Sequence, residues 1–140
     1  MIACDDVIFS PMPALLTKIL VLSLGGILGT LARYGLGGFV QNRFPNSTFP
    51  WGTLVVNVLG CLTIGFLWIL VEDKPILTPN MRLFSMIGFL GAFTTFSTFS
   101  LETVNLMAKS QWSAAAVNVA ASVGCCLVST VLGMTLARSL

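Results

Sequence analysis

The segment GFLGAFTTFSTFSLE, residues 88–102, decides how this chain must be built. It begins as an apolar helix should, and phenylalanines then recur at every third position (Phe93, Phe96 and Phe99). Five hydroxyl side chains fall among them within seven positions: Thr94, Thr95, Ser97, Thr98 and Ser100. Two interpretations of this polarity stay open. The hydroxyls bond back to the carbonyls of one continuous helix, or they accompany a break in that helix.

The composition around this segment is that of a membrane protein. Of 140 residues, 56% are hydrophobic and 9% are charged, whereas soluble domains carry about 25% charged residues. Four apolar runs are each long enough to cross a bilayer, which takes about 20 helical residues. They are residues 19–40, 51–71, 83–101 and 112–137, and only Arg33 interrupts them with a charge. We therefore expect an all-α membrane protein with four transmembrane helices, forming one domain over residues 14–140 after a short extension at 1–13.

The basic residues decide the orientation of these helices only weakly. Cytoplasmic loops normally carry an excess of lysine and arginine. One side of the predicted protein has Lys18, Lys74, Arg82 and Arg138. The other has Arg43 and Lys109, together with Arg33 if its side chain extends outward. Either both termini face the cytoplasm, or copies insert both ways and pair antiparallel, as the halves of many transporters do within one chain.

Polar groups inside the first two predicted helices suggest both packing and ion contact. Gly25 and Gly29 have the spacing of closely packed membrane helices. Arg33 either extends to the headgroups or concentrates anions at a pore mouth. Thr53 and Asn57 share one helix face with Gly60. The Asn57 amide either bonds another helix or donates to a passing anion.

The fourth predicted helix places Asn118, Ser122 and Cys126 on one face, a pattern more typical of packing than of a pore lining. Cys61 and Cys125 also lie in predicted helices, and none of the cysteines has metal-site spacing. We interpret the cysteines as small packing residues.

Residue types that the sequence lacks exclude several kinds of catalysis and transport. The chain has no histidine, so it cannot form a serine–histidine or cysteine–histidine nucleophilic pair. We place Glu102 at the end of the third run, which leaves no carboxylate inside a predicted helix, although proton-coupled carriers normally need one. The net charge of +2 comes from scattered cations and does not indicate a nucleic-acid partner. The sequence therefore favours a passive route through the membrane over an enzyme.

Three segments together resemble the Fluc (CrcB) fluoride channels: GGILGTLARY (25–34), GTLVVNVLG (52–60) and the opening segment. The likeness covers roughly residues 15–138. It implies an antiparallel, dual-topology homodimer in a bacterial inner membrane, with the third helix broken near its middle, that passively exports fluoride. It also implies a structural, non-transported sodium ion at the dimer centre, bound by the main-chain carbonyls of Gly91 and Thr94 from each copy.

The same resemblance implies which side chains line the fluoride pathway: Asn57, Phe96, Phe99 and Ser122, with Thr95 or Thr98 as hydroxyl donors. Asn118 stands where many members have a tyrosine, and it remains a hydrogen-bond donor. The chemistry suits fluoride, because a dehydrated anion needs donors along its path and aromatic ring edges carry positive charge. Two other classes of function are weighed against a channel. A small dual-topology multidrug exporter would need an intramembrane carboxylate, and a non-conducting assembly subunit would need only the packing glycines.

Overall fold

The computed structural model describes residues 12–74 and 76–140, and every regular element in those ranges is a helix. Three long helices are continuous: α2 (Met12–Gln41), α3 (Trp51–Glu72) and α7 (Trp112–Arg138). Four stretches in the described ranges are long and apolar enough to cross a membrane, which confirms the predicted four-helix architecture. The predicted extension at residues 1–13 falls almost entirely outside the described ranges and stays a prediction.

The third membrane-crossing stretch is divided into pieces. It consists of α4 (Pro79–Arg82), the π-helix η1 (Leu83–Leu90), α5 (Gly91–Phe93) and α6 (Phe96–Ala108). Between α5 and α6, Thr94 (φ −84°, ψ 158°) and Thr95 (φ −152°, ψ 117°) are extended. Of the two interpretations of the opening segment, the structure therefore shows the broken helix. The wider π-helical turn was not predicted.

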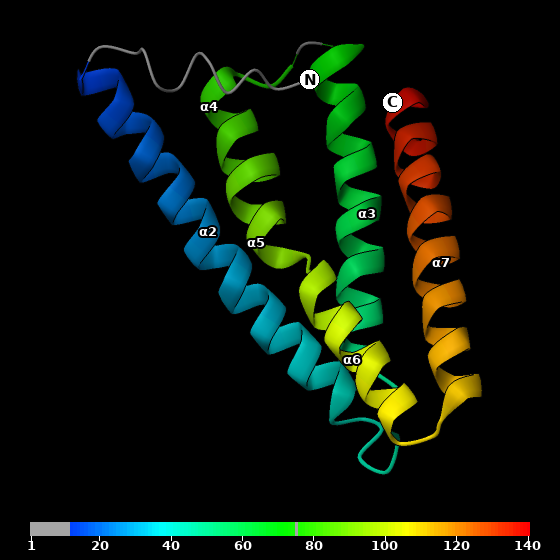
Figure 1. The fold of residues 1–140 in the computed structure, drawn as a ribbon. Coiled ribbons are helices and arrows are strands. Elements are labelled where there is room, and N and C mark those ends of the chain that lie inside the picture. The colour runs from blue at the N-terminus through cyan, green and yellow to red at the C-terminus, as the bar shows by residue number, and fades with distance from the viewer. Residues whose placement is uncertain (1–11, 75) are drawn as a thin grey trace.

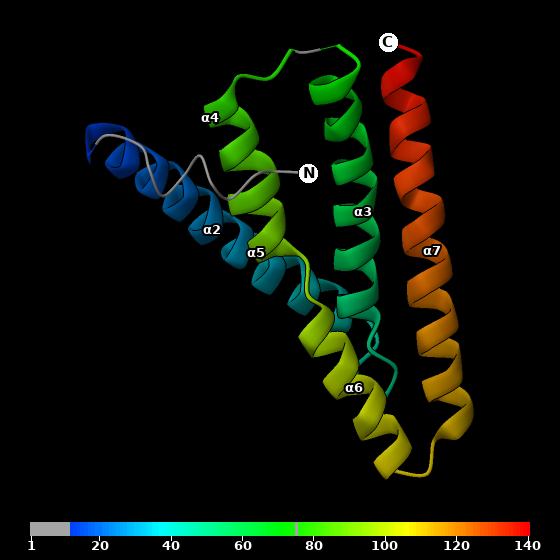
Figure 2. The same ribbon diagram turned by 45° about the horizontal axis from the view of Figure 1, so that its top comes forward.

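The helices form an open, V-shaped bundle (Figures 1 and 2). α3 and α7 lie side by side and run in the same direction, while α2 is inclined away from them and approaches α3 at the lower end. η1 and α5 pack on α2, and α6 packs against α7. The break in the third stretch thus lies where the chain passes from the α2 side of the bundle to the α7 side.

Glycines let two pairs of helices meet backbone to backbone. Gly25 and Gly29 are buried, and a Cβ on Gly29 would collide with the carbonyl group of Phe89. On the other side, a Cβ on Gly65 would collide with the Thr130 carbonyl, and one on Gly133 with the Leu62 carbonyl. Small residues allow this close approach where helices associate in a membrane. The predicted packing role of Gly25 and Gly29 is confirmed.

The upper end of the bundle pairs its cations with carboxylates. Arg82 lies 3.7 Å from Glu72, and Arg138 lies 3.4 Å from Asp73. Two of the four basic residues counted on this side are therefore accompanied by acidic partners. The count of lysines and arginines on the two sides is unchanged by these pairs, because acidic residues contribute little to the orientation of membrane helices.

Candidate functional site

Asn57 on α3 forms hydrogen bonds with the backbone at the break in the third stretch. Its Nδ2 donates to the Thr95 carbonyl at 3.0 Å, and its Oδ1 accepts from the Thr95 amide at 2.8 Å. Both backbone groups of an extended residue are thereby satisfied in a place where a membrane supplies no water. Of the two roles considered for Asn57, the hydrogen bond to another helix is present in the structure.

Among the backbone amides that the break redirects, two bear on the predicted cation site. In a continuous α-helix the Thr95 amide would donate to Gly91 and the Thr98 amide to Thr94. Here the Thr95 amide donates to Asn57, and the Thr98 amide donates to the Thr95 hydroxyl at 3.2 Å. The carbonyls of Gly91 and Thr94 thus lose their helical donors. These are the two carbonyls on which the predicted cation site depends.

Hydroxyls of the opening segment begin the next helix. The Thr95 hydroxyl is the N-cap of α6, because it accepts from the amide three residues later. The same hydroxyl donates to the Thr98 Oγ at 3.0 Å and lies 3.3 Å from the Ser97 Oγ. Ser100 instead bonds back to the Phe96 carbonyl of its own helix. Both predicted uses of these hydroxyls therefore occur, with capping at the break and back-bonding beyond it.

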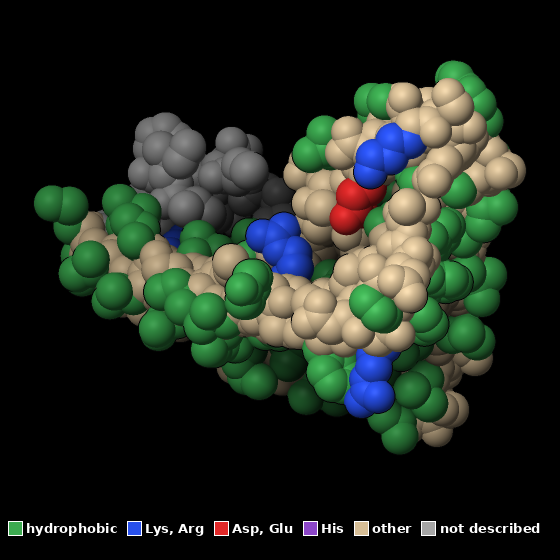
Figure 3. Space-filling view, turned by 90° about the horizontal axis from the view of Figure 1, so that it is seen from below, with side chains coloured by type: hydrophobic (Ala, Val, Ile, Leu, Met, Phe, Trp, Pro, Cys, Tyr) green, Lys and Arg blue, Asp and Glu red, His purple; other side chains and the backbone are tan. Residues whose placement is uncertain are grey.

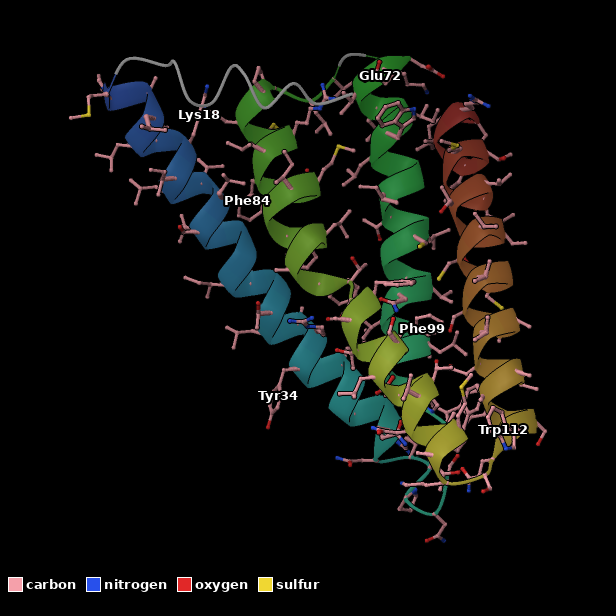
Figure 4. All side chains as sticks on the ribbon, viewed as in Figure 1. Lys18, Tyr34, Glu72, Phe84, Phe99 and Trp112 are labelled. Atoms are coloured by element: carbon pink, nitrogen blue, oxygen red, sulfur yellow. The ribbon has the colours of Figure 1, made fainter. Side chains whose placement is uncertain are left out.

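A cavity of about 310 Å³ lies beside the break, between α6, α3 and α7. It gathers residues that the sequence placed on three separate helices, namely Asn57, Thr95, Phe96, Phe99 and Ser122. Phe99, labelled in Figure 4, is buried on α6, whereas Phe96 is 77% exposed on the single chain. Their rings lie 5.3 Å apart, centroid to centroid. The structure thus brings five of the predicted pathway residues to one cavity.

A second cavity, of about 400 Å³, opens between α2, α3 and α6. Its lining includes Arg33, Thr98 and Thr95, so Thr95 borders both cavities. Seen from below, basic and acidic side chains border a hollow in the surface (Figure 3). Arg33 is half-buried in this lining, and its predicted role at a pore mouth stays a prediction.

Glu102 corrects one sequence prediction. The third stretch extends from Pro79 to Ala108, so Glu102 lies inside it rather than at its end. The carboxylate lines the second cavity and accepts a hydrogen bond from the Thr53 hydroxyl at 2.8 Å. Its other oxygen is buried without a hydrogen-bond partner. The contact with Thr53 joins α3 to α6, and no local sequence pattern predicts it.

Asn118 is not part of the first cavity's lining. It is 1% exposed and donates to the Thr103 hydroxyl of α6 at 2.9 Å, and that hydroxyl donates to the Phe99 carbonyl at 2.7 Å. Ser122 lies 3.5 Å from the Asn118 Oδ1. Asn118 therefore joins α7 to the helix that carries Phe99. Thr103 was not predicted as part of this site, although its position four residues after Phe99 places it on the same helix face.

Comparisons with known proteins show what the chain is similar to. A family model described as "CrcB-like protein, Camphor Resistance (CrcB)" matches residues 20–134. Three relatives share the name "Fluoride-specific ion channel FluC". One from Nitratidesulfovibrio vulgaris is 55% identical over 69% of this chain and 77% of its own. One from Nitrosococcus oceani is 42% identical over 86% and 96%, and one from Geobacter sulfurreducens is 44% identical over 89% and 100%.

Proposed function

The chain belongs to the CrcB family, and from this premise we propose that it is a fluoride-selective channel that passively exports the ion. The family is one of ion channels rather than enzymes. The observation that carries the proposal for this chain is the cavity beside the break, where an amide, hydroxyls and two phenylalanines meet. The relatives come from bacteria and the chain has four membrane-crossing stretches, so we place it in the bacterial inner membrane.

The lining of the two cavities suits a small, strongly hydrated anion. An anion that leaves water must find donors along its whole path, since an unpaired charge in an apolar medium is very costly. Thr98 offers a hydroxyl, and Asn57 has a second amide hydrogen beyond the one given to Thr95. The Ser122 hydroxyl donates only a long bond of 3.5 Å to the Asn118 Oδ1, which an anion could replace. The edges of Phe96 and Phe99 add positive partial charge. Arg33 raises the local anion concentration where the second cavity opens.

The second part of the proposal is an antiparallel, dual-topology homodimer. Two features of the single chain support it. A Cβ on Gly91 would meet no atom within 4 Å, so the backbone at the break is open on that side. Phe96 is also largely uncovered, although it stands beside the cavity. A second copy would cover both, and it would close the cavity into a pathway shielded from lipid.

The third part is a structural sodium ion bound by the carbonyls of Gly91 and Thr94 from both copies. The residues fit such an ion, because the break takes away the helical donors of these two carbonyls. Small hard cations prefer oxygen ligands, and rings of backbone carbonyls hold them inside membranes. The bound ion would neutralise the converging carbonyl dipoles and leave the neighbouring path more favourable for anions.

Fluoride efflux from liposomes tests the function against its alternatives. Purified protein in vesicles loaded with fluoride should release it electrogenically, without proton movement. Proton-coupled exchange of a cationic drug would instead indicate the multidrug exporter, with Glu102 in the third helical stretch as its candidate carboxylate. Vesicles that hold folded protein but retain fluoride would indicate a non-conducting subunit.

A further inference from the structure

Two cysteines that the fluoride pathway does not use face the same cavity. Cys61 on α3 and Cys126 on α7 are both half-buried and both line the cavity beside the break. The neighbouring Cys125 is exposed and is not part of this lining. The thiols therefore form a pair rather than a scattered set.

The register of the two helices explains why these thiols meet. α3 and α7 run side by side in the same direction (Figure 1). Asn57 on α3 and Ser122 on α7 line the cavity, and so do Cys61 and Cys126, which follow them by four residues on the same two helices. One further step brings Gly65 and Thr130 into backbone contact. The helices are thus held together one turn above the thiols, so the pair is fixed by backbone packing.

We propose that Cys61 and Cys126 form a binding site for soft, two-coordinate divalent metal ions, of which Hg²⁺ is the representative, and that occupancy slows fluoride passage. Thiolates are the preferred ligands of soft metals. Binding releases one proton from each thiol. The product, one Hg²⁺ with two thiolates, carries no net charge, which favours it in an apolar interior.

The coordination geometry limits which ions fit. Zinc is bound in proteins by four ligands in a tetrahedron. Within residues 12–74 and 76–140, no group of three or more His, Cys, Asp or Glu side chains is placed to hold a metal ion. Two thiols therefore suffice for a linear ion and do not suffice for zinc.

The consequence for transport rests on the proposed fluoride pathway. A metal bridging the two thiols would lie one helical turn from Asn57 and Ser122, inside the same cavity. It would occupy space there and link α3 to α7. The expected effect is a loss of fluoride efflux on addition of Hg²⁺ and its recovery with a dithiol chelator.

The experiment uses the full chain with its other two cysteines removed, as the variant C4S/C125S. Hg²⁺ is added, loosely held metal is washed off with excess glutathione, and retained mercury is measured per chain alongside the thiols that still react with N-ethylmaleimide. Zn²⁺ serves as the matched ion. The same measurements are made with Cys61→Ser or Cys126→Ser added, each compared with its own efflux rate before metal.

Retention of one Hg²⁺ per chain, protection of both thiols and inhibited efflux, all lost on either further substitution, would support the site. Equal retention after either substitution, or inhibition by Zn²⁺ to the same extent, would overturn it. Mercury retained without any slowing would overturn the inhibitory role. Metal retention is measured without transport, so a protein that fails to conduct fluoride would refute the proposed function and leave the test of the site intact.

Discussion

The two hydrogen bonds between Asn57 and Thr95 should determine how firmly the break in the third stretch is held. Replacing Asn57 with leucine keeps a side chain of similar size and removes both bonds. Interhelical hydrogen bonds in membranes are worth about 0.6 kcal/mol on average and up to about 1.7 kcal/mol each. Two such bonds give an expected loss of about 1–3 kcal/mol in the free energy of unfolding. The upper end is favoured because both Thr95 groups are left unpaired at a buried position.

Reversible unfolding in mixed detergent and lipid micelles would measure this loss, and fluoride efflux would be recorded in parallel. Thr63→Val is a matched control on the same helix, because the Thr63 hydroxyl is exposed and bonds only the Leu59 carbonyl of its own helix. Asn57→Asp adds a second test. At neutral pH a carboxylate can still accept from the Thr95 amide but cannot donate to the carbonyl, whereas in acid the protonated group can do both.

Asn57→Asp should therefore suppress efflux at neutral pH and regain part of its stability as the pH falls. If the free energy of unfolding of Asn57→Leu lay within about 0.5 kcal/mol of the parent's, the range of ordinary surface changes, the two hydrogen bonds would not stabilise the break. A Thr63→Val variant that was destabilised as much as Asn57→Leu would show that the loss does not come from the bonds to Thr95.

Three further predictions concern the aromatic pair, the glycine contact and the cation. Phe96→Ile should suppress fluoride efflux while the protein still elutes as a dimer, because isoleucine has no ring edge. Leu101→Ala, at an exposed position on the same helix, is the control. Equal efflux from both variants would remove Phe96 from the pathway. Gly29→Ala should cost about 1–3 kcal/mol in unfolding experiments, since its Cβ meets the Phe89 carbonyl group. Gly35→Ala meets no atom within 4 Å and should be neutral or stabilising, and similar values for the two variants would contradict the packing argument. Prolonged dialysis against sodium-free buffer should reduce efflux, with recovery when sodium is restored; full activity without sodium would argue against the carbonyl site.

The third stretch shows where the sequence was sufficient and where it was not. The hydroxyls of the opening segment left a broken and a continuous helix equally open, because serine and threonine can cap a helix or bond back to it. The structure contains both uses, in Thr95 and Ser100. The contact with Asn57 of α3 determines that the helix breaks at Thr95, since the Asn57 amide supplies the donor and the acceptor that the Thr95 backbone groups lose there.

Glu102 and Asn118 make contacts with other helices that the sequence did not predict. The apolar run ends at Leu101, so a prediction from composition stops the third helix there. The helix instead continues to Ala108, since glutamate is itself a good helix former, and the Thr53 hydroxyl of another helix donates to the Glu102 carboxylate. Asn118 was interpreted from its family position as a pathway residue, and that role stays a prediction. Its buried amide bonds Thr103, a contact set by the packing of α7 on α6.

What the sequence determined by itself is the architecture. Four apolar stretches must be helices, because a membrane leaves no other way for an open chain to satisfy its own backbone groups. The shared faces of Thr53 with Asn57 and of Asn118 with Ser122 also follow from helical periodicity alone. What only the tertiary structure decided is which faces meet. The capping of the break, the two cavities that Thr95 borders and the position of Cys61 and Cys126 on one cavity all depend on the register of separate helices. That register is set by backbone contacts at glycines far apart in the chain, and a local pattern carries no information about it.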